Sequence, residues 1–281
     1  TKVNKAVFTS CKKDDNCPPW AIQADEIVHD KKKKQLSYKN AILRVYDIPV
    51  MYFPKFFHPD PTVKRQSGFL QPELNNSLTL GSSFSIPYYY LIADNKDLTI
   101  KPTFFDSDMN SLHGEYRQKN LNSSLIADFG YVSKFKSNYS HNKKNILHFF
   151  AKSEIDLNWN NFTDSDLRLN FERTNKDTYL KIFENQLFNN ISKPKNSDLL
   201  SSGIDLKLVH KKFNLDTGFS TYEDLNKLQS DRYQFILPYF NFNSELLSND
   251  LIMVNLYSNG SNILQNTNNL RTKVINNLNF S

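Results

Sequence analysis

Residues 147–160 read Leu-His-Phe-Phe-Ala-Lys-Ser-Glu-Ile-Asp-Leu-Asn-Trp-Asn, and this stretch decides the fold class. Every second residue from Leu147 is apolar or small, whereas the residues between them are mostly charged, amide or imidazole side chains. Such alternation is typical of a β-strand with one apolar and one polar face, because successive side chains of a strand point to opposite sides. A helix would instead repeat its apolar residues every three or four positions.

The same alternation recurs from about residue 77 to the end of the chain. Segments of about ten residues are separated by polar turns rich in Asn, Ser, Asp and Lys. We count roughly ten to twelve expected strands in this part, one of them running from Leu78 to Ile86. Short connections, such as residues 211 and 212, join consecutive strands. The sequence therefore predicts an all-β antiparallel meander without helices.

The chain before this meander has a different pattern. Short apolar strands are expected near Trp20 and within residues 36–46, and a run rich in prolines follows. Proline has no backbone N–H to donate to a neighbouring strand, so this run precludes a regular central strand. We expect residues 1–66 to form a small β-domain with its linker, and residues 67–281 to form a larger β-domain.

Composition limits the class of protein. Aromatic residues make up 14% of the 281 residues, which argues against disorder because so many rings need burial. No run reaches the roughly 18 apolar residues of a membrane-spanning helix. A membrane barrel stays admissible, since only every second residue of a strand must face lipid. Charged residues on one strand face and aromatic residues at strand ends favour the barrel over a soluble β-sandwich or β-solenoid.

The residues that carry chemistry in enzymes form no motif here. His113 and His148 lie far apart in the sequence, and core or surface histidines are the default interpretation. A glycine-rich phosphate loop is absent, and no Ser and His are visibly aimed at one point. We therefore predict no catalytic residues, no cofactor and no enzymatic activity.

Charge and cysteine content are weak signals. The net charge of +6 would suit an anionic partner, but the lysines are spread along the chain, so a nucleic-acid partner is not predicted. Cys11 and Cys17 are separated by five residues, and a local disulfide between them is geometrically allowed. A metal site is not expected, because no second Cys or His pair follows at ligand spacing.

A more specific signal lies in two adjacent segments. Residues 41–54 read Ala-Ile-Leu-Arg-Val-Tyr-Asp-Ile-Pro-Val-Met-Tyr-Phe-Pro, and residues 58–72 read His-Pro-Asp-Pro-Thr-Val-Lys-Arg-Gln-Ser-Gly-Phe-Leu-Gln-Pro. Together they closely resemble the junction between the periplasmic β-jellyroll and the barrel of the LptD (OstA) family of Gram-negative outer-membrane proteins. Several further segments resemble the family's jellyroll and barrel in order, namely residues 11–24, 81, 87–90, 94–102, 114–117 and 230–238.

This resemblance implies a conduit for lipopolysaccharide (LPS) rather than an enzyme. Residues 1–66 would be the C-terminal part of the periplasmic β-jellyroll, and residues 67–281 the first, incomplete part of a transmembrane β-barrel in the cell outer membrane. LPS would pass from the jellyroll groove through a lateral gate of the barrel into the outer leaflet. The implied partners are a plug lipoprotein like LptE, a periplasmic bridge protein like LptA, and the lipid of the outer membrane.

The resemblance also assigns roles to individual residues. Pro72 and Pro87 match the family's gate prolines and would weaken strand pairing there. The plainer alternative is that Pro72 starts a strand and Pro87 marks a bulge. The family's cysteines can pair between jellyroll and barrel, so whether Cys11 pairs with Cys17 or with another residue stays open.

Two functions from different classes stay open. The first is the LPS conduit in a membrane barrel, in which one face of the strand that starts near residue 147 is expected to contact lipid through Leu147, Phe149, Ile155 and Leu157. The alternative is a soluble all-β binding module or adhesin. That module would bury the same apolar residues between two sheets.

Overall fold

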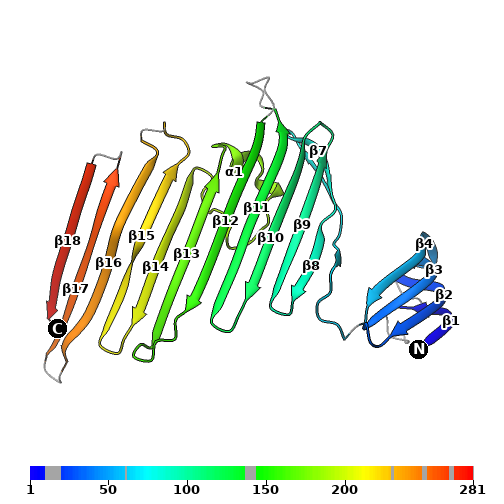
Figure 1. The fold of residues 1–281 in the computed structure, drawn as a ribbon, viewed down its shortest axis with the longest axis horizontal. Helices are drawn as coiled ribbons and strands as arrows, with labels where there is room; N and C mark the ends of the chain where they lie inside the picture. Colours follow the sequence, from blue (N-terminus) through cyan, green and yellow to red (C-terminus); the bar gives the residue numbers. More distant parts are fainter. Residues whose placement is uncertain are drawn as a thin grey trace. The chain divides into compact units, whose positions relative to one another are not determined.

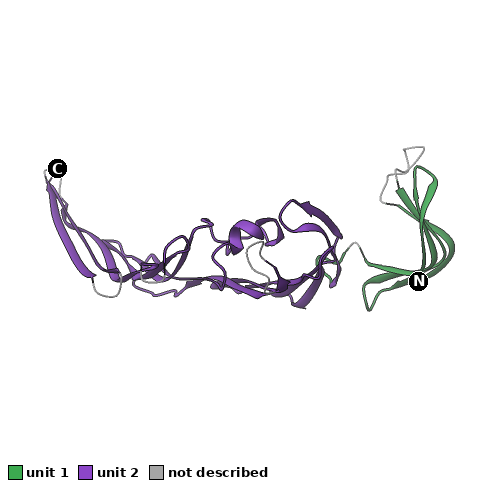
Figure 2. Ribbon diagram, turned by 90° about the horizontal axis from the view of Figure 1, so that it is seen from above, with its two compact units in different colours: residues 1–66 green, residues 67–281 purple. Residues whose placement is uncertain are grey.

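The computed structural model describes residues 1–9, 20–60, 62–136, 144–228, 231–248, 252–265 and 269–280. The chain divides into two compact units, Thr1–Gln66 and Ser67–Ser281 (Figure 2). Both consist almost entirely of antiparallel strands, which confirms the predicted all-β class. Among the described residues, no helix is both long and apolar enough to cross a membrane.

The first unit is a four-stranded antiparallel sheet. Its strands β1 (Lys2–Phe8), β2 (Trp20–Asp30), β3 (Gln35–Val45) and β4 (Ile48–Pro59) pair in chain order. One face carries a small apolar core of Ile22, Ala24, Ile27, Tyr38 and Ala41. That this sheet is the end of a β-jellyroll stays a prediction.

The proline-rich run differs from the expected linker. Residues 48–59 form one continuous strand, β4, although Pro49 and Pro54 lie within it. Among the described residues β4 pairs only with β3, so it is an edge strand. An edge strand tolerates proline because the prolyl nitrogen can face away from the partner strand. The register also shifts between Leu43 and Arg44, beside Pro49, which absorbs part of the misfit.

The second unit is one 14-stranded antiparallel sheet (Figure 1). From β9 to β18, strands that follow each other in the chain pair with each other, as the predicted meander requires. The strands are β5 (Gly68–Phe69), β6 (Glu73–Ser77), β7 (Gly81–Ser85), β8 (Tyr88–Ala93), β9 (Lys96–Phe105), β10 (Asn110–Lys119), β11 (Ser123–Phe135), β12 (Lys144–Asp156), β13 (Asp164–Thr174), β14 (Leu199–Val209), β15 (Phe213–Asp224), β16 (Tyr233–Ser248), β17 (Met253–Gln265) and β18 (Asn269–Phe280).

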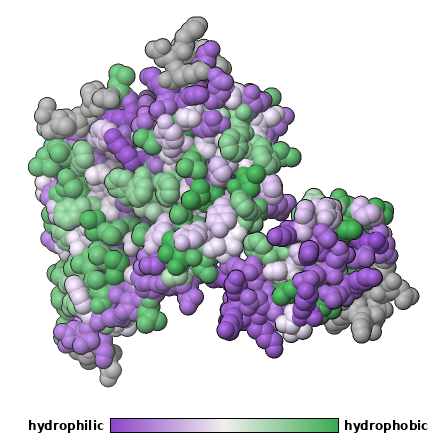
Figure 3. Space-filling model, turned by 45° about the vertical axis from the view of Figure 1, so that its right-hand side comes forward, coloured by the Kyte–Doolittle hydropathy of each residue, from purple (hydrophilic) through white to green (hydrophobic). Residues whose placement is uncertain are grey.

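The two faces of this sheet differ in polarity, as the alternation in β12 predicts. Leu147 and Phe149 are 52% and 43% exposed on one side, which we call the apolar face. The other side, which we call the polar face, carries the buried polar residues Lys101, Asp128 and His148. Ile146 and Phe150 are buried on the same side. Further exposed residues of the apolar face are Leu112, Phe129, Tyr131, Phe171, Ile204 and Phe219. Figure 3 shows apolar side chains over much of the middle of unit 2, with hydrophilic side chains nearer its top.

Residues 175–198, which we call the inner segment, join β13 to β14 and fold back over the polar face (Figure 2). The segment contains the short helix α1 (Tyr179–Ile182) and a 3₁₀ turn at Glu184–Gln186. The rings of Tyr179 and Phe183 are fully buried and stack on each other, 5.1 Å between centroids. The sequence predicts no helix here, because a few buried rings in a polar stretch produce no periodic pattern.

The neighbouring residues Phe149 and Phe150 test which face packs against protein. Phe150→Ala should lower the free energy of unfolding by roughly 3–5 kcal/mol, because it leaves a cavity under the inner segment. Phe149→Ala should cost clearly less, since Phe149 is partly exposed. Urea denaturation of the full-length protein in detergent micelles measures both. Equal losses would contradict the assignment of the faces.

Candidate functional site

The first two strands of unit 2 are each interrupted at a proline. β5 and β6 are the halves of the first strand, and Pro72 lies between them. β7 and β8 are the halves of the second strand, and Pro87 lies between those. β5 pairs with β8 and β6 pairs with β7, so both interruptions lie at the same level. We call residues 67–93 the proline hairpin.

The backbone ladder of the proline hairpin is open at this level. Phe69 lies opposite Tyr88 and Glu73 opposite Ser85, so residues 70–72 face only residues 86–87. One extra residue in the first strand makes this a bulge. The N–H of Leu70 donates to the Pro87 carbonyl at 2.8 Å, but Pro87 has no N–H for the return bond. At this level of the hairpin, a missing backbone N–H donor and a bulge therefore occur together.

Side chains on the polar face bridge the open level. The Lys101 ammonium of β9 is buried and lies 3.8 Å from Oε2 of Glu73, the residue after Pro72. The Ser85 hydroxyl donates to the same oxygen at 3.4 Å. The ammonium also lies 5.0 Å from the centre of the Phe188 ring, in the inner segment. Lys101 thus touches both the proline hairpin and the inner segment.

Two histidines that are distant in sequence meet beside Lys101. His113, Gly130 and His148 lie opposite one another on β10, β11 and β12. Gly130 leaves the room for both rings, since an added Cβ would lie 2.4 Å from an atom of each. The Tyr179 hydroxyl lies 2.6 Å from His148 Nδ1 and 3.1 Å from His113 Nε2. His148 Nε2 in turn lies 3.1 Å from Asp128 Oδ1.

The contacts of this cluster join the inner segment to the sheet. His113, Asp128, His148 and Tyr179 are all buried. Burial also raises the pKa of Tyr179 well above its usual range, which keeps the hydroxyl neutral. Within the described ranges, no group of three or more His, Cys, Asp or Glu side chains is placed to hold a metal ion.

Further polar contacts anchor the inner segment. Asn190 donates to Glu115 Oε1 at 2.8 Å. Arg232 donates to Asp177 Oδ1 and to Glu223 Oε1, each at 2.6 Å. The hydrogen bond from Arg232 holds the pKa of Asp177 below its usual value, so this anchor weakens only when the pH falls far enough to protonate Asp177. The segment is therefore tied to β10 through Asn190 and, through Asp177, to Arg232, the residue before β16.

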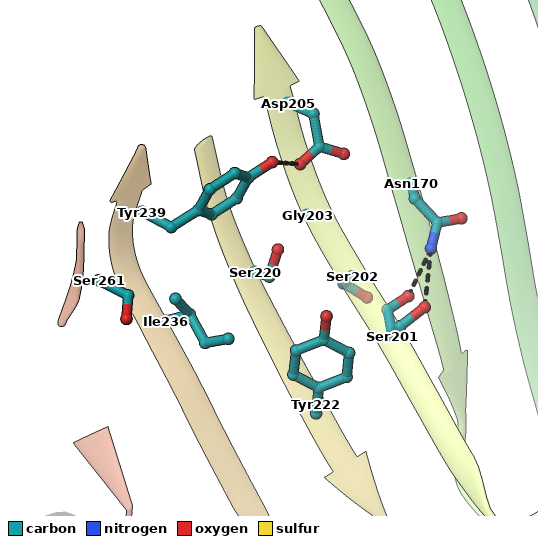
Figure 4. A pocket seen from close by; sticks show the side chains of 10 residues that line it. All are labelled: Asn170, Ser201, Ser202, Gly203, Asp205, Ser220, Tyr222, Ile236, Tyr239 and Ser261. Carbon is teal, nitrogen blue, oxygen red and sulfur yellow. Dashed lines mark hydrogen bonds between the residues drawn. The ribbon is translucent and has the colours of Figure 1, made fainter. Parts of the chain in front are cut away.

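A second hollow lies farther along the polar face, over β13 to β17 (Figure 4). There the Asn170 amide donates to the Ser201 carbonyl at 2.7 Å, and the Tyr239 hydroxyl donates to Asp205. The first bond joins β13 to β14, and the second reaches from β16 over β15 to β14. None of the predicted site residues lines this hollow. The hollow is a feature of the polar face and does not form part of the hairpin site.

Known proteins resemble this chain over most of its length. The LPS-assembly protein LptD of Shewanella denitrificans is 29% identical over 263 residues, which covers 87% of this chain and 32% of that protein. The LptD of Pseudoalteromonas translucida is 33% identical over 177 residues, or 62% of this chain and 22% of that protein. That of Legionella pneumophila strain Paris is 30% identical over 194 residues, or 66% and 23%. The chain belongs to the LptD family.

The chain spans between about a fifth and a third of the length of these LptD relatives. No protein-family model matches it. Among solved structures, the crystal structure of OccD1 (OprD) Y282R/D307H aligns with 93% of this chain and 89% of that chain at 9% identity, with a TM-score of 0.32.

In this LptD-family chain the structure brings the two predicted gate prolines to the same level of one hairpin. Pro72 directly precedes β6, and Pro87 lies in the bulged gap before β8, as the plainer alternative also predicts, so their role as a gate stays a prediction. The predicted lipid-facing residues share the apolar face of β12 and its end, where Ile155 and Leu157 are partly buried. Their contact with lipid stays a prediction. Cys11 and Cys17 lie outside the described residues.

The side chains beside the proline hairpin were not predicted from the sequence. Lys101, His113, His148 and Tyr179 come together only once strand register is fixed, and no local motif marks them. One usable signal was present. Pro72 and Pro87 lie symmetrically about the turn at residues 78–80, Pro87 and Pro102 lie symmetrically about the turn at residues 94–95, and residues placed symmetrically about a hairpin turn share one level.

Gly130 tests whether the histidine cluster fastens the inner segment. Gly130→Ala should push the two histidine rings apart and loosen Tyr179, so trypsin should cleave after the lysines of residues 175–198 several times faster in the folded full-length protein. Gly68→Ala is the matched control, because no heavy atom lies within 4 Å of its added Cβ. Equal cleavage rates in both variants would show that the cluster does not hold the segment.

Proposed function

We propose that this chain is part of a protein that transports LPS to the outer leaflet of the outer membrane, and that the proline hairpin is one side of the lateral gate. The proposal rests chiefly on one observation. The two strands at one edge of a sheet with an exposed apolar face are both interrupted by prolines at the same level. The relatives' printed name, LPS-assembly protein, supports the same role.

The polarity of the sheet supports a place in the membrane. Lipid-facing strands carry apolar side chains on the outside and polar ones toward the lumen, and unit 2 has such faces. A soluble binding module, the alternative, would cover the apolar face with a second layer. We propose that unit 2 is part of a closed barrel, in which further strands pair with β18 and with the first strand, β5 and β6.

The lengths of the connections between strands support one orientation of unit 2 in the membrane. Outer-membrane barrels have short periplasmic turns and longer outer loops. On one side of the sheet, residues 94–95, 120–122 and 210–212 form short turns, whereas residues 175–198 connect strands on the other side. The first strand begins at the short-turn side, where Ser67 Oγ accepts the N–H of Leu91. We therefore assign residues 1–66 to the periplasm, as the end of the jellyroll.

The cargo explains why weak strand pairing would be useful. A lipid with several acyl chains and a phosphorylated head crosses neither water nor hydrocarbon cheaply as a whole, because each medium disfavours one part of it. A barrel that joins an apolar groove to a polar lumen and opens at a seam removes this conflict. Pro72 and Pro87 leave the hairpin with fewer ladder hydrogen bonds to break at such a seam.

The partners belong to the same proposal. A periplasmic bridge protein like LptA would add a strand to a free edge of unit 1, since an exposed sheet edge accepts a strand from another chain. Among the described residues, β1 and β4 each pair on one side only. A plug lipoprotein like LptE would occupy the polar lumen, and membrane lipid would cover the apolar face. No cofactor takes part, because the protein acts as a conduit.

Site-specific photocrosslinking in the full-length cellular protein tests the gate. Probes at Phe69 and Leu74, which flank Pro72 and are 76% and 82% exposed, should form adducts with newly made LPS early in a pulse label. Probes at Leu147 and Ile155 on the apolar face should label later, as LPS spreads in the membrane. Simultaneous labelling at all four positions would contradict the gate. Recovery of the protein in the soluble fraction would favour the binding module.

A further inference from the structure

Three prolines stand at one level on three successive strands. Pro72 and Pro87 interrupt the two strands of the proline hairpin, and Pro102 lies inside β9. Phe84 pairs with Phe104, and Tyr88 pairs with Ile100, so the same register on both sides sets Pro102 opposite Ile86. Ile86 belongs to the gap between β7 and β8.

The missing donor of Pro102 faces the proline hairpin. The N–H of Asp106 donates to the Ser82 carbonyl at 2.9 Å, on the β7 side. Backbone groups of alternate residues point to the same neighbour, so Pro102, four residues earlier, also faces β7 and β8. Since Pro102 has no N–H, β9 cannot donate to the carbonyl of Ile86.

On its other side, toward β10, β9 has an uninterrupted ladder of hydrogen bonds. Asn95 accepts a hydrogen bond from the Lys119 N–H at 2.8 Å, which shows that the residues alternating with Pro102 serve β10. The pairing of β9 with β10 continues from Phe104 to Lys96 without a register shift. Against β8, in contrast, β9 has a register shift between Leu91 and Ala93 in addition to the gap. The weaker edge of β9 is thus the one toward the proline hairpin.

We propose that the moving part of the gate is the whole proline hairpin, residues 67–93, and that Pro102 weakens its attachment to β9, the first fixed strand. This inference rests on the proposed gate function and extends it. Neighbouring strands are about 4.8 Å apart, so displacing both strands of the hairpin removes about 10 Å of the sheet, whereas displacing only the first strand removes about half of that width. A lipid with several acyl chains side by side needs the wider opening.

The side chains at this level fit a reversible attachment. Where the ladder is open, the ion pair of Lys101 with Glu73 reaches from β9 to the first strand. The Glu73 side chain is 47% exposed, and water screens such a pair, so it is a weak link. A weak link in place of ladder hydrogen bonds holds the hairpin in register yet allows it to separate.

Two engineered disulfides distinguish a moving hairpin from a moving seam. Tyr89→Cys with Thr99→Cys would lock the hairpin to β9, and Leu98→Cys with Tyr116→Cys would lock β9 to β10 as the control. Both pairs lie directly opposite and outside the hydrogen-bonded rungs, where the spacing suits a disulfide. Each variant of the full-length protein is compared in its oxidised and reduced forms, so that the reduced form shows whether it has folded.

The readout is the adduct between a photoprobe at Leu74 and newly made LPS. We expect the disulfide between the hairpin and β9 (the hairpin lock) to lower the amount of this adduct at least tenfold in the oxidised form, with recovery on reduction. The disulfide between β9 and β10 (the control lock) should leave the amount unchanged. An undiminished adduct in the oxidised hairpin lock, or an equal loss in both locks, would overturn the inference. Absence of any adduct in the unlocked protein would instead overturn the proposed gate function.

Pro102→Ala provides a second measurement in a protein without a disulfide. The restored N–H can donate to the Ile86 carbonyl, so amide hydrogen exchange within residues 82–93 should slow severalfold in the folded full-length protein. Exchange within β10, on the other edge of β9, should stay unchanged. Equal exchange rates in residues 82–93 with and without the substitution would contradict the weakening role of Pro102.

Discussion

Backbone hydrogen bonding is the constraint on which this structure depends. A strand with an exposed apolar face cannot leave N–H and C=O groups unpaired in hydrocarbon, so each strand needs a neighbour that matches it along its length. From β10 to β17 each strand meets this demand by pairing with a neighbour on both of its sides. At the level of Pro72 and Pro87 it is met only in part, and side chains of the polar face, Lys101 and Glu73, lie across the gap instead. The same constraint that unifies the sheet therefore also marks its weakest place.

The inner segment depends on the sheet in a comparable way. Its buried Tyr179 needs hydrogen-bond partners, and His113 and His148 supply them because Gly130 between them has no side chain. A buried hydroxyl without partners would cost free energy, so the segment has one preferred place on the sheet. Phe188 of the segment then covers Lys101, which links this fixed region to the edge where the ladder is open.

The sequence alone predicted what depends on local periodicity. Alternation from Leu147 to Trp159 correctly indicated β12 and the polarity of its two faces. The same reasoning was wrong for the strand expected from Leu78 to Ile86, because residues 78–80 form a turn in which Leu78 is exposed and Leu80 is buried. An apolar turn residue that packs under a loop looks like part of a strand when only spacing is considered.

What depends on register could not be predicted from the sequence. Gly130 separates two histidines only because β10, β11 and β12 pair as they do, and a slip of one residue would turn these side chains to the other face. β4 was expected to be a linker because its prolines were considered without knowing that the strand lies at an edge. The gate prolines were predicted from the resemblance to a family. That they lie at the same level of the hairpin follows only from the pairing of its strands, which the sequence does not reveal.

The chemistry of proline explains why such a weak place can remain ordered. Proline removes one donor but keeps its carbonyl, so each of these residues deletes hydrogen bonds on one side of its strand and leaves the other side free to pair. Pro87 still accepts the N–H of Leu70, and β9 keeps its full pairing with β10 although Pro102 lies within it. Replacing the prolines by a flexible loop would have lost the register together with the hydrogen bonds. Directional loss of donors weakens the attachment of the hairpin while the strands stay in place.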